Sequence, residues 1–190
     1  MTDLLALFNQ GLAEFGARVH RVGADHWSDS TPCSDWDVGS LVEHLIDEQL
    51  WVPPLVSGHD LATADTMVKA ERHSLGDDRA AAWDAAALAS KRAAGEPGAL
   101  DRQVELSRGP TPASDYIGEM IMDAVVHAWD LGHAIGYREP LPDDLVQFTL
   151  AGVQAFGDLS TTGLFSPAVP VPDDASAEDR LIAFTGRDPR

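Results

Sequence analysis

The apolar residues of this chain recur at three- and four-residue spacing in several separate segments, and this pattern limits its fold more than any other feature. Within residues 3–22 this spacing is followed by Leu4, Leu5, Phe8, Leu12, Phe15, Val19 and Val22. Such positions form one continuous face of a helix, whereas the alternation of a half-buried strand is almost absent from the chain. The pattern predicts an all-α protein, for which a bundle is the simplest closed packing.

Proline, glycine and small polar residues divide the chain into elements. We expect a second helix over about 37–52, capped by Ser34 or Asp35 and ended by Pro53 and Pro54. Residues 56–76 have weak periodicity and are interpreted as a mobile connection with at most a short helix. The remaining expected elements are an alanine-rich helix over 77–98, an extended piece over 100–112, a long helix over 113–136 with Gly136 at its end, and two further helices over 143–158 and 177–186.

Length and charge bound the class of protein. At 190 residues the chain is expected to form a single domain, with a bundle core in about 3–136 and C-terminal helices and loop in 143–190. Its 31 Asp and Glu against 13 Lys and Arg give a net charge of −18, which would repel nucleic acid and anionic lipid. A small molecule or another protein is the expected partner, and an exposed apolar helix face would support a homodimer.

The ends and the cysteine content indicate a compartment. No apolar run approaches the roughly 18 residues that cross a bilayer, and the first residues carry an acid where a secretory signal carries Lys or Arg. The cytoplasm is therefore the expected location. The single cysteine, Cys33, excludes an internal disulfide and a cysteine-rich zinc site. It is interpreted as a semi-buried structural thiol, and Trp36 and Trp129 as core anchors.

A polar stripe follows one side of the helix expected over 113–136. Glu119, Asp123, His127 and Asp130 share this side, and no Lys or Arg occurs between Arg108 and Arg138. A solvated face usually carries both signs of charge, so an unpaired acidic stripe favours a bound cation. Asp123 and His127 lie one helical turn apart and can reach a single metal ion. The alternative is an ordinary solvent face that binds no metal.

A third ligand would have to come from another helix, because two ligands bind zinc only weakly. His44 lies at the edge of an apolar stripe, with Glu48 one turn further on. A histidine in this position is also typical of a structural hydrogen-bonding group. His133 lies roughly 120° around the helix from His127, too far to share its metal. The residues alone leave the third ligand open.

Three stretches resemble a known family. These are "TPCSDWDVGSLVEHL", "DAVVHAWDLGHAIG" and the ending "EDRLIAFTGRDP". They are similar to the actinobacterial mycothiol-dependent maleylpyruvate isomerase-like, metal-binding families of the DinB/YfiT-type four-helix-bundle superfamily. The resemblance implies a DinB-like four-helix bundle with additional C-terminal helices. It also implies a divalent metal held by His44, Asp123 and His127.

Two departures from the family limit what the resemblance implies. The isomerase has a further C-terminal domain, whereas only a short stretch follows residue 136 here, so maleylpyruvate is not the expected substrate. The acid is Asp123 where the isomerase has a glutamate, and this shortens the ligand arm by one carbon. Zinc is the preferred metal, but nickel, iron and manganese suit the same donors.

The site predicts chemistry on a thiol. Two imidazoles and one carboxylate leave coordination positions open, and a bound cation favours a thiolate. The resemblance implies mycothiol as co-substrate of a transferase or isomerase acting on a small electrophile. Glu48 and Asp130 are the expected catalytic acids, which orient the imidazoles or move the thiol proton, unless they are plain surface acids. The alternative is a non-catalytic, metal-stabilised bundle that binds a small ligand or partner, with Glu48 as a fourth metal ligand.

Overall fold

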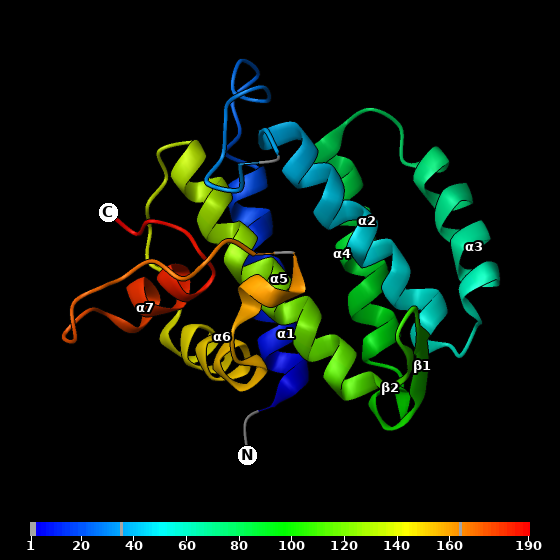
Figure 1. Cartoon of the computed structure of the whole chain (residues 1–190). Coiled ribbons are helices and arrows are strands. Elements are labelled where there is room, and N and C mark those ends of the chain that lie inside the picture. Colours follow the sequence, from blue (N-terminus) through cyan, green and yellow to red (C-terminus); the bar gives the residue numbers. More distant parts are fainter. Residues whose placement is uncertain (1–2, 35, 164) are drawn as a thin grey trace.

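The computed structural model describes residues 3–34, 36–163 and 165–190 (Figure 1). The helices are α1 Leu4–Val19, α2 Val38–Val56, α3 Leu61–Ser74, α4 Arg79–Ala94, α5 Ala113–Ala134, α6 Asp143–Phe156 and α7 Ala177–Phe184, with short 3-10 turns at Ala99–Asp101 and Leu159–Thr162. The strands β1 Gln103–Leu106 and β2 Gly109–Pro112 form one antiparallel hairpin. The prediction of an all-α protein is confirmed, and the expected extended piece is this hairpin.

Four helices form the bundle. α1 packs against α5 and α2 against α4, while contacts between α1 and α4 and between α2 and α5 close the ring. The apolar face predicted for the first helix supplies core residues such as Phe8, Leu12 and Phe15, each at most 1% exposed. Burying one such side chain contributes about 1.5–3 kcal/mol. Outside the ring, α6 packs on α5 and α7 packs on α6, as expected of additional C-terminal helices.

Aspartates cap the first four helices. The carboxylates of Asp3, Asp37, Asp60 and Asp78 accept hydrogen bonds from amides of the first turns of α1, α2, α3 and α4. The cap of α2 is therefore Asp37 and not Ser34, while the other proposed cap, Asp35, lies outside the described residues. Just after the C-terminal end of α5, Gly136 has φ +71°, the left-handed conformation expected of a glycine that ends a helix.

The predicted end of the second helix is wrong. The helix α2 continues through Pro53 and Pro54 to Val56, because the carbonyls of both prolines accept bonds from Ser57 and His59 and the last turn buries Leu55 and Val56. The prolines remove only amide donors, and this loss is offset by the burial of that turn.

The interpretation of residues 56–76 as a mobile connection is also wrong, because most of this segment forms the helix α3. It buries only Ala64 and Val68, which explains why its apolar periodicity is weak. Its Asp60 cap and an ion pair of 2.9 Å between Arg72 Nε and Asp47 Oδ1 fix it beside α2. Within the described residues, no helix is long and apolar enough to span a membrane.

Candidate metal centre

Three side chains meet where α2 packs against α5. Nε2 of His44 lies 3.5 Å from Oδ2 of Asp123, and Nε2 of His127 lies 3.4 Å from Oδ1 of the same carboxylate. One ligand atom from each of the three residues lies within 4.8 Å of the others. The fold thus brings His44 of α2 to the pair on α5, and these are the three residues proposed as ligands from the sequence.

The donor set fits a divalent cation. Oδ2 of Asp123 is buried and makes no hydrogen bond within the described structure, although a buried carboxylate oxygen normally has a partner. Two imidazole nitrogens and a carboxylate are ligands that zinc and the neighbouring transition metals accept. A cation among these three residues would supply the partner that Asp123 lacks.

The charges of the ligands are strongly linked. Burial disfavours the charged form of His44, but Asp123, with Glu48 and Asp47, outweighs this effect and raises the pKa of His44 above 6.5. Burial would raise the pKa of Asp123, yet the nearby His127 and His44 lower it. Asp123 therefore favours the protonated form of His44 beside it.

Asp130 contacts the ring nitrogen of His127 that faces away from Asp123. Its Oδ2 lies 2.9 Å from Nδ1 of His127, and its side chain is fully buried. The pKa of Asp130 is lowered, since hydrogen bonds from His127 and Arg187 outweigh the effect of burial. An ionised carboxylate only accepts, so Nδ1 of His127 donates to Asp130, and this contact turns Nε2 of the ring toward Asp123. Asp130 thus contacts the ring of His127, one of the three candidate ligands, and its predicted catalytic roles stay predictions.

Arg187 is the functional residue that sequence reasoning missed. Its Nε and Nη2 each donate to Asp130 over 2.8 Å, and its Nη1 donates to the Thr185 carbonyl over 3.0 Å. The side chain is only 8% exposed. The one signal in the sequence was the ending "EDRLIAFTGRDP", which marked the family without indicating a partner.

Two acids of the polar stripe on α5 have arginine partners. Arg108, in the turn of the β hairpin, pairs with Glu119, and Arg187 pairs with Asp130. Both arginines come from elements that fold back onto α5, and spacing along the helix could not reveal them. Only Asp123, in the middle of the stripe, has no Lys or Arg at ion-pair distance in the described part of the chain. The charge argument for a cation therefore applies to Asp123 alone.

Glu48 and Tyr116 lie beside the metal ligands. Burial, reinforced by the charge of Asp123, raises the pKa of Glu48, which is half-buried and does not join the group of three ligand atoms. Tyr116 is 3% exposed, and its hydroxyl has no hydrogen-bond partner among the residues that the structure describes. Burial and the charges of Glu48, Glu119 and Asp123 raise the pKa of this phenol. Glu48 is thus part of the site's surroundings and not an isolated surface acid.

The unpartnered hydroxyl gives a stability prediction. Tyr116→Phe removes a buried donor without changing the shape of the ring, so we expect the metal-free protein to be equally stable or more stable by about 1 kcal/mol. Urea unfolding measures this difference. Tyr137→Phe is the control, because that ring is only partly buried, and a loss above about 1 kcal/mol for Tyr116→Phe alone would show that the hydroxyl has a partner.

Trp36 and Cys33 lie closer to the site than expected. The ring of Trp36 lies 4.3 Å from the ring of His44 and 5.4 Å from that of His127, so this residue covers both imidazoles instead of serving only as a core anchor. Cys33 is partly buried, as predicted, and its sulfur lies within 4.8 Å of ligand atoms of His127 and Asp130.

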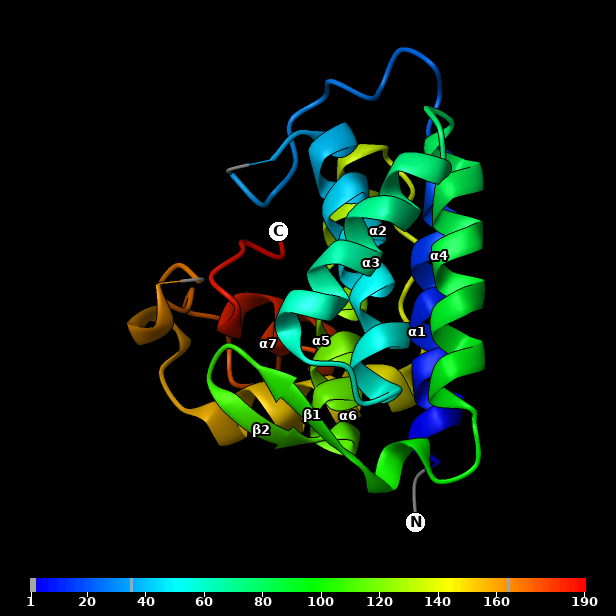
Figure 2. The same ribbon diagram turned by 90° about the vertical axis from the view of Figure 1, so that its right-hand side faces the viewer.

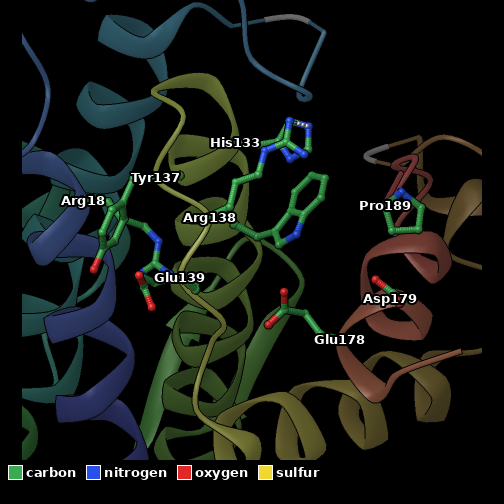
Figure 3. Close-up of a pocket in the computed structure, with 10 residues that line it drawn as sticks. Arg18, His133, Tyr137, Arg138, Glu139, Glu178, Asp179 and Pro189 are labelled. Atoms are coloured by element: carbon green, nitrogen blue, oxygen red, sulfur yellow. Dashed lines mark hydrogen bonds between the residues drawn. The ribbon is translucent and has the colours of Figure 1, made fainter.

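His133 and Trp129 belong to a separate cavity. Trp129 stacks on His133 at 4.6 Å, and Nη2 of Arg138 lies 3.0 Å from Nε2 of His133. The cavity, of about 130 Å³, also meets Glu178 and Pro189 from the C-terminal segment, as Figure 3 shows. Its lining mixes both signs of charge, and His133 joins neither group of potential ligand atoms found among the described residues.

Comparison with known proteins identifies the relatives of this chain. The family model described as the mycothiol maleylpyruvate isomerase N-terminal domain matches residues 8–132. Two Mycobacterium tuberculosis proteins, Uncharacterized protein MT0763 (strain CDC 1551 / Oshkosh) and Uncharacterized protein Rv0738 (strain ATCC 25618 / H37Rv), are each 30% identical to the chain over 188 residues. Each alignment covers 97% of this chain and 98% of the relative.

A solved structure shares the fold. The crystal structure of the mycothiol-dependent maleylpyruvate isomerase superposes with a TM-score of 0.61 at 16% identity, over 79% of this chain and 68% of that one. The DinB-like architecture implied by the three sequence stretches is therefore confirmed. Because the family match spans more than half of its length, the chain belongs to the mycothiol maleylpyruvate isomerase N-terminal domain family.

Proposed function

We propose that this protein binds a divalent metal and uses it to activate mycothiol for transfer or addition to a small electrophile, as a thiol transferase or isomerase. The observation that carries the proposal is the buried carboxylate oxygen of Asp123, unpartnered between the Nε2 atoms of His44 and His127. The family's name, and that of the structurally similar isomerase, supply the thiol.

His44, Asp123 and His127 would hold the metal. Zinc is the preferred ion, while nickel, iron and manganese accept the same donors. Three protein ligands are the usual number in catalytic zinc sites, which keep a position for an exchangeable ligand. A bound divalent cation favours the thiolate form of a small thiol, and thus supplies a nucleophile at neutral pH.

The surrounding residues have distinct tasks. Asp130 and Arg187 keep His127 in one ring orientation and one tautomer, and both oxygens of Asp130 are occupied, so we assign it positioning and not proton transfer. We assign Glu48 to receive the thiol proton, because burial raises the pKa of its carboxyl group toward pH 7, where a general base is most effective. Trp36 limits access of water to the imidazoles.

The electrophile is left as a chemical class. The isomerase match covers 68% of that protein's chain, so part of the isomerase has no counterpart in the aligned region. The shorter arm of Asp123 also distinguishes the site from the glutamate described for the isomerase. We therefore propose a small, activated carbon electrophile in general, and not maleylpyruvate.

Cobalt substitution tests the proposal. We expect the cobalt-loaded protein to develop a thiolate-to-cobalt absorption band with mycothiol, but not with an analogue that carries hydroxyl in place of thiol. The band should decay when an α,β-unsaturated carbonyl compound is added and a thioether forms. Bound cobalt without such a band would support the alternative, a non-catalytic metal-stabilised bundle. No bound metal would exclude both, and Asp123 would then be a carboxylate held by His44 and His127 alone.

Zinc affinity should depend on pH in a defined direction. Metal binding requires neutral His44, and the pKa of His44 is raised above 6.5 in the metal-free protein. We expect the affinity to rise about tenfold per pH unit below that pKa and to level off above it, because one proton leaves the imidazole for each ion bound. Competition with a chromophoric chelator between about pH 6 and 8 measures it.

The matched control for the pH series is His20→Ala, since His20 is exposed and pairs only with Asp84 far from the site. This variant should follow the wild-type curve. An affinity that stays constant across the range would show that no ligand histidine titrates on binding.

A further inference from the structure

The helices α1 and α4 form a face of small residues on the side of the bundle away from the metal centre. Figure 2 shows α4, with α1 beside it, along the edge opposite to α7. The exposed positions of these two helices include Ala6, Asn9, Ala13, Ala17, Ala81, Asp84, Ala85 and Leu88. Leu88 is 49% exposed, although it is a large apolar side chain.

A hollow runs between the two helices next to Leu88. Its volume is about 320 Å³, and Ala13, Gly16 and Ala17 of α1 form one wall. Asp84 and Lys91 of α4 line the other wall with Leu88. An exposed leucine beside a hollow of small residues is the arrangement by which one helix face can receive the same face of another molecule.

The charge of this face differs from that of the rest of the chain. The net charge of the protein is −18, so two copies repel each other over most of their surface. On this face, however, Asp84 is balanced by Lys91 and Arg92, while Arg18 is buried and Arg79 pairs with Glu43 of α2. Glu14 is already bound by Arg18 over 2.7 Å. Two copies can therefore approach here with the least repulsion.

The charged residues of α4 are also complementary to themselves. Asp84 lies one turn before Leu88 and Lys91 nearly one turn after it, on the same side of the helix. A twofold axis at Leu88 would set two α4 helices antiparallel, so that positions before Leu88 face positions after it. Asp84 lies 2.9 Å from Nε2 of His20 in its own chain, and its carboxylate would then also face Lys91 of the other copy, giving two equivalent ion pairs between copies, with Arg92 adjacent.

We propose that the α1–α4 face is the interface of a homodimer, in which two α4 helices pack antiparallel and each Leu88 enters the hollow of the other copy. The alanines at positions 81 and 85 allow the two backbones to approach closely. The metal centre lies between α2 and α5, across the bundle, and stays open in this dimer. The proposal does not depend on the proposed function.

Charge reversal tests the interface. By light scattering at about 100 µM we expect the wild type to have twice the mass of one chain. Asp84→Lys and Lys91→Asp should each weaken the dimer at least about tenfold, because both ion pairs become repulsive. An equimolar mixture of the two variants should restore the dimer, since both cross-pairs in the mixed species are attractive.

Controls separate the interface from general effects of charge. Lys69→Asp reverses an exposed charge on α3 and should leave the dimer intact. Circular dichroism should show the same helix content in all four proteins. A monomeric wild type, single variants that stay dimeric, or a mixture that stays monomeric would each overturn the proposal.

Discussion

Replacing Asp123 with alanine is expected to leave the bundle folded and to remove its zinc, from about one ion per chain to none after dialysis. Asp123 contacts both imidazoles and is the only carboxylate in the set of three, so its loss leaves two neutral ligands that bind zinc weakly. Its Oδ2 makes no hydrogen bond in the described structure, so the metal-free protein should lose little stability. Elemental analysis of untagged protein measures the metal, and thermal unfolding measures the stability.

The matched control is Asp47→Ala. Asp47 is an acid of the neighbouring α2 that is 51% exposed and pairs with Arg72, so its removal should not change the metal content. His44→Ala should lose the metal as completely as Asp123→Ala, because it removes the ligand contributed by α2. Metal content that survives both ligand changes would show that the ion lies elsewhere and that the three-residue centre is not its site.

Replacing Arg187 with leucine is expected to destabilise the protein by about 3–5 kcal/mol at neutral pH, the largest stability effect that we predict. The change leaves the fully buried Asp130 without the cation that holds both of its oxygens. Denaturant unfolding of the metal-free variant gives the free energy directly.

The effect of Arg187→Leu should depend on pH. In the wild type the pKa of Asp130 is lowered below 3.8, so the pair stabilises the fold above that value and the contribution is lost as the pH falls. In the variant, which lacks the guanidinium, burial favours the protonated form of Asp130. Acidification therefore stabilises the variant, while it removes the contribution of the ion pair from the wild type. The difference in stability should therefore narrow toward low pH.

The double variant Arg187→Leu with Asp130→Leu separates the pair from the packing. Two apolar side chains leave no buried charge, so most of the lost stability should return. Zinc affinity should remain about 10–100-fold below that of the wild type, because His127 has lost the acceptor that orients it. A single variant that loses less than about 1 kcal/mol would show that the ion pair contributes nothing measurable.

Local patterns predicted most of the fold. The helices α1, α4, α5, α6 and α7 were expected close to their observed positions. The apolar faces of α1 and α5 are visible as three- and four-residue spacing, and α4 is visible from its alanine content and the residues at its ends. The i, i+4 spacing of Asp123 and His127 placed both side chains on one side of α5. His44 required the resemblance to the family, since nothing within α2 distinguishes a ligand from a structural histidine.

The failures have a common physical origin. The helix α3 was missed because only Ala64 and Val68 are buried, and its position is held by a cap and an ion pair to α2. The arginine partners of Glu119 and Asp130 were missed because they come from a hairpin turn and from the segment after α7. Contacts between distant segments leave no periodic signal in a single sequence.

The pairing of Arg187 with Asp130 has a consequence for how the protein matures during synthesis. Arg187 is synthesised after all four bundle helices, so a bundle that forms before this segment docks holds Asp130 without its arginine partner. The contact of Asp130 with the ring of His127 gains its support from Arg187 only when the segment after α7 docks. Docking of that segment is therefore a late step in the assembly of the candidate centre.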